Sequence, residues 1–305
     1  MNILVLGSTG FIGKNLVTRL RKDGHCVSTA ERSTGVDLRD YGQTLTLLQE
    51  VGPDIIYNLA SHGGSVHYVR ENAAKVYHDN VQMALNLYKS VLETNSKIKI
   101  IQPFSNCSYP GHSKIQKEEE WLNGDVHSSV FSFGNSKRSI FYLSECYRVQ
   151  HNIRSVNILF PNTYGPGDSN DPNHTHALNG MIIRMLEAKR KQDKHFVVWG
   201  TGAPIREWAY IDDFITILIK CLDIDGLEYP INMGQSRGYS IKETANLIKE
   251  ACNFQGDIIF DTNYKDGAPI KIMDGTNFDK VFKNFKFFDH LEGIRKTVKF
   301  YEDLK

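Results

Sequence analysis

The chain has 305 residues, 41% of them hydrophobic and 23% charged, which is the composition of an ordinary globular protein of one or two domains. Lys and Arg number 36 against 35 Asp and Glu, so the formal net charge of +1 argues against nucleic acid and against a strongly charged partner. No apolar stretch approaches the roughly 20 residues of a membrane-spanning helix, and the five cysteines lack the spacing of a disulfide framework or a metal site. With no signal-peptide pattern before the first strand, we expect a cytoplasmic protein with no membrane contact and no bound metal.

Apolar strand-like segments alternate with amphipathic helical segments through the N-terminal half. Residues 2–6 predict a buried strand, and residues 11–23 predict a helix that ends at Gly24. Further strands are expected over residues 26–30, 54–59, 98–104 and 155–159, and further helices over residues 81–94 and 137–150. Strands that alternate with helices imply right-handed crossovers, so the pattern predicts an α/β fold with a Rossmann-type parallel sheet.

The sequence changes character after Pro161. Residues 165–176, GPGDSNDPNHTH, form a polar segment longer than an ordinary connection and are therefore a candidate functional loop. A helix over residues 178–190 and a strand at residues 197–198 follow. We expect a dinucleotide-binding Rossmann domain over residues 1–165 and a smaller α/β substrate lobe over residues 166–305, interwoven with the first.

The motif GSTGFIG, residues 7–13, lies directly between the first strand and the first helix. Gly7 and Gly10 allow a tight turn and a close approach of the backbone to a pyrophosphate, while Gly13 allows the helix to contact the sheet. The start of the helix presents N–H groups and the positive end of its dipole to the same phosphates. A purely structural turn is the alternative, but the flanking strand and helix favour a dinucleotide site.

Glu31 ends the second predicted strand. A carboxylate at that position accepts hydrogen bonds from the ribose hydroxyls of NAD and repels the 2′-phosphate of NADP. The neighbouring Arg32 could instead bind that phosphate, and a solvated charge pair is the third interpretation. The pair favours NAD and leaves NADP open.

Further motifs accompany the glycine turn: SNCSYP at residues 105–110, GNSK at 134–137, NTYGP at 162–166, VWGTGAPIRE at 198–207 and DGAPIK at 266–271. With these motifs the chain resembles the extended short-chain dehydrogenase/reductase family, in its nucleotide-sugar epimerase/dehydratase branch, and most of all the GDP-L-fucose synthases of that branch. The resemblance spans the chain to about Asp274. It implies an NAD(P)-dependent enzyme that acts on a GDP-sugar, and a homodimer formed through the helices at residues 81–94 and 137–150.

In that family a Ser, a Tyr and a Lys form the redox centre, and this chain departs from the pattern at one of the three. Ser105 matches the serine that hydrogen-bonds the reacting sugar oxygen, and Lys137 matches the lysine that holds the nicotinamide ribose and lowers the tyrosine pKa. The tyrosine position, four residues before the lysine, holds Phe133. Loss of a general acid typically costs about 10²–10⁴ in rate, so hydride chemistry should be crippled.

Two explanations of Phe133 remain open. The chain is an inactivated variant of a tyrosine enzyme, or it carries Phe133 natively and either recruits another acid or performs no redox chemistry. Tyr109 and Tyr142 are the candidate substitutes, although neither has the family tyrosine's helical offset from Lys137.

Cys107 and His176 match the cysteine and histidine with which GDP-L-fucose synthases move protons at carbons beside a 4-keto group. A ketone acidifies its neighbouring C–H bonds, and the reference pKa values of thiol and imidazole, roughly 8.5 and 6.5, suit proton transfer near neutral pH. The alternative is that Cys107 is a packing residue and His176 an ordinary loop histidine.

The resemblance also assigns binding residues. The cofactor would contact Gly7, Thr9, Gly10, Phe11, Ile12, Gly13, Glu31, Arg32, Asp37, Leu38, Leu59, Ala60, Asn80 and Lys137. The GDP moiety would be held by Asn162, Arg184, Trp199, Arg206 and Lys271. Arginine and lysine bind a diphosphate through charge-assisted hydrogen bonds, and tryptophan offers an apolar wall.

The leading hypothesis is an epimerase/reductase of a GDP-4-keto sugar, in which Cys107 and His176 invert a carbon and Ser105 and Lys137 take part in reduction at C4. The nearest alternative is a nucleotide-sugar 4-epimerase or 4,6-dehydratase that recycles its hydride. A 4-keto sugar epimerase without net redox would account for Phe133. A non-catalytic sensor of nucleotide-sugars or dinucleotides is the alternative from another class.

Overall fold

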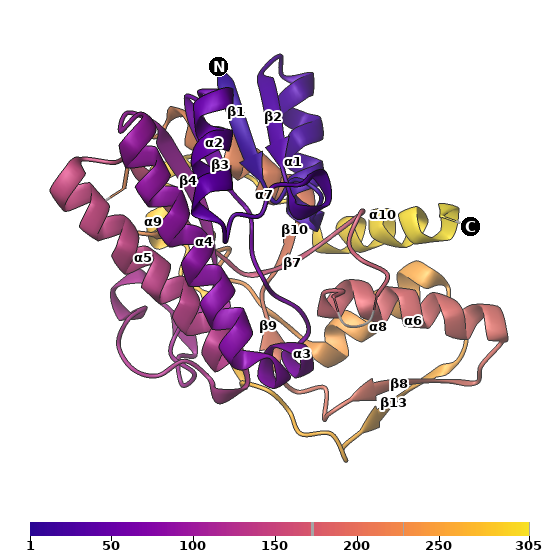
Figure 1. The fold of residues 1–305 in the computed structure, drawn as a ribbon. Coiled ribbons are helices and arrows are strands. Elements are labelled where there is room, and N and C mark those ends of the chain that lie inside the picture. The colour runs from indigo at the N-terminus through magenta and orange to yellow at the C-terminus, as the bar shows by residue number, and fades with distance from the viewer. Residues whose placement is uncertain (172–173, 228, 305) are drawn as a thin grey trace. The chain divides into compact units, whose positions relative to one another are not determined.

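The computed structural model describes residues 1–171, 174–227 and 229–304, and its contacts divide the chain into two compact units (Figure 1). Unit 1 comprises Met1–Ser108, Val130–Leu159 and Ile215–Ile231, and unit 2 comprises Tyr109–Ser129, Phe160–Phe214 and Asn232–Lys305. The division differs from the predicted single boundary after residue 165. Local hydrophobic patterns predict helices and strands but not which distant elements pack together. They therefore do not predict that residues 109–129 belong to unit 2 or that residues 215–231 belong to unit 1.

The centre of unit 1 is a parallel sheet. Within the described residues it has six strands in the order β11-β6-β4-β3-β1-β2. Their bounds are β1 Asn2–Leu6, β2 Cys26–Ala30, β3 Ile55–Asn58, β4 Lys99–Ser105, β6 Ser155–Phe160 and β11 Ile231–Asn232. The pairs β1–β2, β1–β3 and β3–β4 are parallel. The predicted Rossmann-type α/β fold is confirmed.

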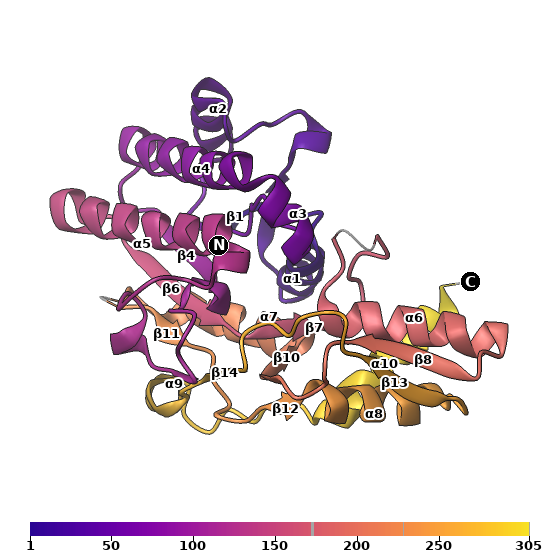
Figure 2. The same cartoon turned by 90° about the horizontal axis from the view of Figure 1, so that it is seen from below.

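Helices α2, α4 and α5 of unit 1 lie side by side as one layer (Figures 1 and 2). The helices here are α1 Phe11–Lys22, α2 Tyr41–Val51, α3 Val66–Glu71, α4 Ala73–Thr94 and α5 Phe131–His151, with the short 3₁₀ helices η1 Arg32–Thr34, η2 Asn106–Ser108 and η5 Cys221–Asp223. Helices α4 and α5 begin earlier than predicted, because polar residues and a glycine in their first turns interrupt the apolar period. Helix α2 was not among the predicted helices, although Asp40 caps it by accepting a hydrogen bond from the N–H of Gln43 at 2.9 Å.

Apolar side chains of the sheet and of this helix layer form the core of unit 1. The strands contribute Leu4, Leu6, Ile56 and Ile100, and the helices contribute Leu48, Leu87, Tyr88 and Val91. Full burial of a side chain of this size stabilises the fold by roughly 1.5–3 kcal/mol. This packing makes the strand ends, where the glycine turn begins, a rigid base for a site.

Unit 2 combines short strands with packed helices. Its helices are η3 Glu118–Glu120, α6 Ala177–Lys191, α8 Ile241–Cys252, α9 Thr276–Val281 and α10 His290–Asp303. Its strands are β5 Ile115–Gln116, β7 Asn162–Tyr164, β8 His195–Trp199, β9 Ile205–Arg206, β10 Trp208–Tyr210, β12 Tyr239–Ser240, β13 Asp257–Asp261 and β14 Ile270–Met273. Helices α6, α8 and α10 pack on one another (Figure 2), β8 pairs with β13, and β12, β9, β14 and β5 form a sheet.

Two short helices, η4 Ser128–Val130 and α7 Ile211–Lys220, contain residues of both units. Among the helices of the described residues, none combines the length and the hydropathy that crossing a bilayer requires.

Candidate active site

The glycine turn packs its backbone against the segment that follows β3. Gly7 has a φ of +74°, and a Cβ built on it would lie 2.8 Å from backbone atoms of Leu59 and Ala60. A Cβ on Gly13 would lie 2.2 Å from the carbonyl oxygen of Gly7. Strands β2 and β3 flank β1 at this point, where the chain order reverses, and open α/β sheets bind ligands at such positions. The cradle therefore suits the pyrophosphate of a dinucleotide.

Glu31 lies directly after β2, beside the glycine turn. Its carboxylate accepts a hydrogen bond from the hydroxyl of Ser8, and its N–H lies 3.4 Å from the hydroxyl oxygen of Thr34. Arg32 is exposed at the start of η1. The structure thus fixes the carboxylate against the turn and leaves the guanidinium at the surface.

The side chains of three further predicted cofactor residues contact other parts of the protein. Asp37 binds Arg39 through contacts of 2.6 and 2.9 Å, and these hydrogen bonds lower the pKa of Asp37 to about 2. The Leu38 side chain is buried in the core. Asn80 is also buried, and its side chain accepts the N–H of His62 and donates to the carbonyl of the same residue, both at 2.8 Å. The hydrogen bonds of Asn80 therefore hold the loop after β3.

The predicted redox residues of unit 1 lie on α5 and at the end of β4. The Nζ of buried Lys137 donates to the hydroxyl of Ser61 at 3.0 Å, and the centroid of the Phe133 ring lies 5.1 Å from that Nζ. Ser105 ends β4, and its hydroxyl oxygen accepts the N–H of Cys107 at 3.2 Å. Burial lowers the pKa of Lys137 to about 8. The lysine and the ring are in place, but the ring carries no exchangeable proton.

The two tyrosines considered as substitutes have other surroundings. Tyr109 is buried in unit 2, where its hydroxyl donates to Asn232 at 2.7 Å and burial raises its pKa. Tyr142 is 55% exposed on α5. Neither position favours proton transfer at the redox centre.

His176 is the N-cap residue of α6 and is bound to a buried carboxylate. Its Nδ1 lies 3.0 Å from Asp168, which also accepts the N–H of His176 at 2.9 Å. Burial alone would raise the pKa of Asp168, but the hydrogen bonds and charge of His176 lower it below its usual value. A carboxylate on Nδ1 keeps a proton on that nitrogen, so proton transfer to a substrate would take place at Nε2.

Sequence reasoning did not identify Asp168. The available signal was its place in the candidate functional loop, eight residues before His176. Residues 172–173 of that predicted loop lie outside the described residues. A contact across a loop cannot be read from residue spacing.

Arg206 and Lys271 are register partners on the neighbouring parallel strands β9 and β14, so their side chains leave the sheet on the same side. The Asn162 amide donates to the carbonyl of Glu207 at 3.2 Å, and the N–H of Glu207 donates to the carbonyl of Lys271 at 3.1 Å. Two cations and an amide thus belong to one hydrogen-bonded segment of unit 2. Such a group suits a diphosphate.

Glu207 ties this segment to the rest of unit 2 and had no assigned role in the sequence analysis. Its side chain is fully buried and accepts the N–H groups of Gln235 and Met273. Burial raises the pKa of Glu207 to about 8, although both hydrogen bonds oppose that rise. The carboxyl group of Glu207 therefore anchors the strands that carry Arg206 and Lys271.

Arg184 and Trp199 form a group on α6 and β8. Trp199 is 60% exposed and stacks on Tyr264, with ring centroids 4.9 Å apart and 18° between the planes. The Arg184 guanidinium lies 5.2 Å from the Trp199 ring and donates to the carbonyl of Val197. Exposed aromatic rings beside a guanidinium can pack against a flat nucleobase.

Residues 3–234 match the NAD dependent epimerase/dehydratase family. The chain belongs to that family. It is 28% identical to a probable GDP-L-fucose synthase 1 of Oryza sativa subsp. japonica, over 98% of this chain and 91% of the relative. It is 25% identical to a GDP-L-colitose synthase of Yersinia pseudotuberculosis, over 99% of this chain and 98% of the relative.

A solved structure shows the same likeness. The GDP-L-fucose synthetase of Naegleria fowleri bound to NADP has a TM-score of 0.89 to this chain at 26% identity, and the match covers 99% of this chain and 92% of that one. The predicted family and NAD(P) as the class of cofactor are confirmed.

The buried Lys137 ammonium should reduce stability at neutral pH. Because the folded pKa of about 8 is below the ordinary value of 10.5, the unfolded state binds more protons between these values, and the free energy of unfolding rises as pH increases through that window. We expect Lys137→Met to be more stable than the wild type by roughly 3 kcal/mol at pH 7, with the difference shrinking toward pH 10. Urea unfolding at several pH values measures this difference. Lys97→Met, at an exposed position, is the matched control. A stability difference between Lys137→Met and the wild type that stays constant with pH would contradict the lowered pKa of Lys137.

Proposed function

We propose that the protein is an NAD(P)-dependent epimerase/reductase of a GDP-bound 4-keto sugar. The observation that carries this proposal is the histidine His176, fixed by Asp168, in a chain that aligns over almost its whole length with enzymes named GDP-L-fucose synthase and GDP-L-colitose synthase. Cys107 in unit 1 is the second proton-transfer group.

Epimerisation would use the acidity of the carbon beside the ketone. One of Cys107 and His176 removes the proton while the carbonyl oxygen accepts the electron pair as an enolate, and the other returns a proton to the opposite face. The buried Asp168 carboxylate stabilises the imidazolium that forms when His176 accepts a proton. This pair needs no redox change.

Reduction at C4 would use the residues of unit 1. When bound, the nicotinamide supplies the hydride. The Ser105 hydroxyl would donate a hydrogen bond to the C4 oxygen, Lys137 would hold the nicotinamide ribose, and the backbone of the glycine turn would bind the pyrophosphate. Phe133 contributes an apolar wall, so the proton for the C4 oxygen must come from another group.

The nucleotide would be held by unit 2. Arg206 and Lys271 supply positive charge for the diphosphate, and Asn162 lies in the same hydrogen-bonded segment. Trp199 and Arg184 offer a flat, partly exposed surface for the base.

Phe133 favours one second candidate function, a 4-keto sugar epimerase without net redox. That enzyme would need only Cys107 and His176. The two functions differ in one measurable quantity, the consumption of NAD(P)H.

Proton exchange should depend on Cys107 and His176. With GDP-4-keto-6-deoxymannose in D₂O, we expect the wild type to incorporate deuterium beside the ketone and, with NADH or NADPH, to lower the nicotinamide absorbance. Cys107→Ser and His176→Gln should each slow deuterium incorporation by about 10²-fold or more, because each removes a proton-transfer group. Mass spectrometry of the sugar measures the exchange.

The exposed Cys26→Ser and His195→Gln are the matched controls and should exchange at the wild-type rate. Exchange without loss of absorbance would select the second candidate. A wild type that does neither would refute both functions and favour a non-catalytic binding protein.

We also propose that Glu31 makes NAD the better cofactor. The carboxylate held by Ser8 would repel a 2′-phosphate. Glu31→Ser should therefore raise kcat/KM for NADPH relative to NADH by about tenfold or more, while the exposed Glu50→Ser should leave the ratio unchanged. An unchanged ratio for Glu31→Ser would show that the carboxylate does not face the ribose.

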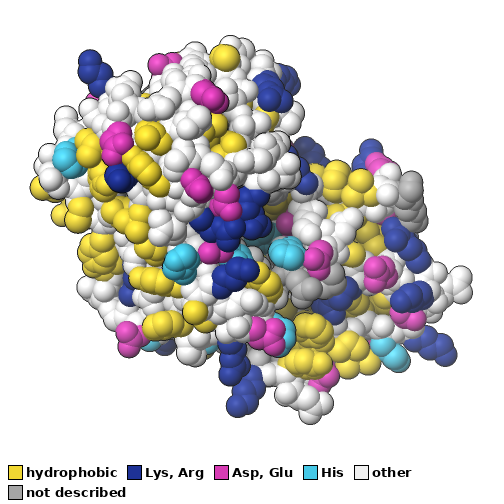
Figure 3. Space-filling view, in the orientation of Figure 1, with side chains coloured by type: hydrophobic (Ala, Val, Ile, Leu, Met, Phe, Trp, Pro, Cys, Tyr) yellow, Lys and Arg dark blue, Asp and Glu magenta, His cyan; other side chains and the backbone are white. Residues whose placement is uncertain are grey.

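A homodimer through α4 and α5 is the proposed assembly. Figure 3 shows hydrophobic side chains gathered over these helices, and the exposed fractions are 42% for Leu85, 55% for Tyr142 and 77% for Val149. Apolar surface of this kind is often buried between subunits. In sedimentation equilibrium we expect a mass twice that of the 34.7 kDa chain, and a single-chain mass for Tyr142→Lys with Val149→Lys. Val281→Lys, at a 41% exposed position of unit 2, is the control; a double variant that stays dimeric would exclude this interface.

A further inference from the structure

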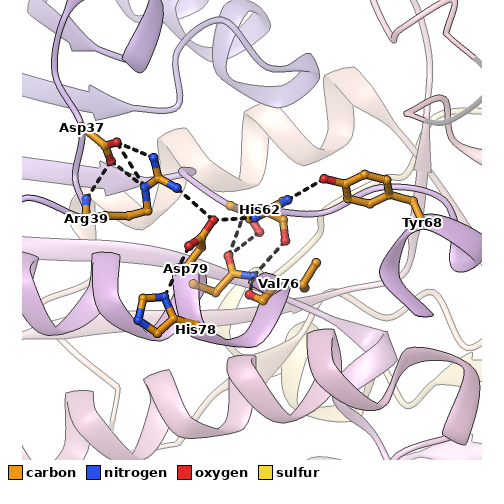
Figure 4. A network of polar contacts seen from close by, with 9 residues as sticks. Asp37, Arg39, His62, Tyr68, Val76, His78 and Asp79 are labelled. Carbon is orange, nitrogen blue, oxygen red and sulfur yellow. Dashed lines mark hydrogen bonds and ion pairs between the residues drawn. The ribbon is translucent and has the colours of Figure 1, made fainter. Parts of the chain in front are cut away.

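A network of polar side chains links the loop after β3 to helices α3 and α4 of unit 1 (Figure 4). His62, in the loop after β3, is bound on both sides: its Nδ1 lies 2.8 Å from Asp79, and its Nε2 lies 2.8 Å from the hydroxyl of Tyr68. The exposed fractions of the His62 and Asp79 side chains are only 19% and 9%. Carboxylate, imidazole and phenol thus form one hydrogen-bonded chain from α4 to α3.

Asp79, the carboxylate of this hydrogen-bonded series, is kept charged. Burial alone would raise the pKa of Asp79, but hydrogen bonds from His62 and His78 and the charge of Arg39, whose Nη1 lies 3.2 Å away, lower it below its usual value. Figure 4 shows Arg39 between Asp37 and Asp79. A charged Asp79 accepts a hydrogen bond from Nδ1 of the imidazole, which leaves Nε2 to face the hydroxyl of Tyr68.

The loop after β3, which carries His62, also contacts Lys137 and Phe133 of the predicted redox centre. Ser61 accepts the Nζ of Lys137 at 3.0 Å. Gly63 packs on Phe133, since a Cβ built on that glycine would lie 3.2 Å from Cε2 of the ring. Helix α3 also contacts α5 at this point: the hydroxyl of Ser132 lies 3.4 Å from the carbonyl oxygen of Val69.

We propose that Tyr68 is the general acid of the reduction, in the role for which Phe133 has no oxygen, and that His62 and Asp79 position Tyr68 and return its proton. The inference rests on the proposed function, because a carbonyl must be reduced for the acid to be needed. It extends that function by naming a phenol that donates the proton in place of the Phe133 ring.

The proton balance of the step is complete. Reduction breaks the C4=O double bond: the carbon gains a hydride from the reduced nicotinamide, which is oxidised, and the oxygen gains the Tyr68 proton. As the O–H bond of Tyr68 breaks, the Nε2–H of the His62 imidazolium protonates the phenol oxygen. Neutral His62 then takes up from the solvent the one proton that the overall reduction consumes, while Asp79 holds Nδ1 throughout.

The test compares reduction with exchange in the same variants. In Tyr68→Phe we expect kcat for NAD(P)H oxidation to fall by about 10²-fold or more, with deuterium incorporation beside the ketone and KM for the GDP-sugar unchanged. The double variant Tyr68→Phe with Phe133→Tyr should recover reduction, because it restores a phenol beside Lys137. Tyr229→Phe, at a 74% exposed tyrosine, is the matched control.

The pH profile reports on the positioning residues. The titratable and charged groups around His62 are Asp79 and His78 on α4, Arg39 and Asp37 before α2, Tyr68 on α3 and Lys137 on α5. Because each reduction uses a proton that passes through His62, kcat for reduction should fall as pH rises. His62→Gln keeps hydrogen-bonding groups but cannot pass on a proton, so it should lower kcat for reduction at least tenfold and weaken the dependence of kcat on pH.

The possible outcomes distinguish a failure of the Tyr68 relay from a failure of the proposed function. Wild-type reduction that Tyr68→Phe or His62→Gln leaves intact overturns the relay and leaves the proposed function standing. A wild type that exchanges deuterium but oxidises no NAD(P)H overturns the relay and selects the epimerase without net redox. A wild type that does neither overturns the proposed function as well. Thermal unfolding and NAD(P)H binding of each variant confirm that a loss of reduction is not a loss of fold.

Discussion

The backbone contact between Gly7 and the segment Leu59–Ala60 is the constraint on which the rest of unit 1 depends. Any side chain at Gly7 would collide with that segment, and any side chain at Gly13 would collide with the turn itself. The contact sets the start of α1 and the path of the chain after β3 at the same edge of the sheet. That path then places Ser61 on Lys137 and His62 on Asp79.

The features that the sequence predicted well are local. The strands at residues 2–6 and 26–30 have the predicted bounds, and the glycine turn lies between a strand and a helix as its spacing requires. Short-range pattern and chain connectivity are sufficient for features of this kind. The roles assigned to Lys137 and His176 came instead from the resemblance to GDP-L-fucose synthases, and they stay predictions.

The features that the sequence did not reveal are contacts between segments that no pattern connects. Asp79 lies 17 residues after its partner His62, and Glu207 holds the backbone of Gln235 and Met273 through its buried carboxyl group. Nothing in the spacing of these residues distinguishes them from ordinary polar side chains. The division into units also depends on such contacts, because residues 215–231 return to a sheet that the chain left long before.

The four hydrogen bonds of the buried Asn80 side chain, to Ser61, to Val76 and twice to the backbone of His62, determine how the loop after β3 responds to ligands. A loop held in this way has already lost most of its conformational freedom before anything binds. A ligand that binds at the surface of this loop therefore loses little free energy to the ordering of the loop. Because a rigid surface cannot adapt to a poorly fitting sugar, binding there should discriminate strongly between sugar shapes.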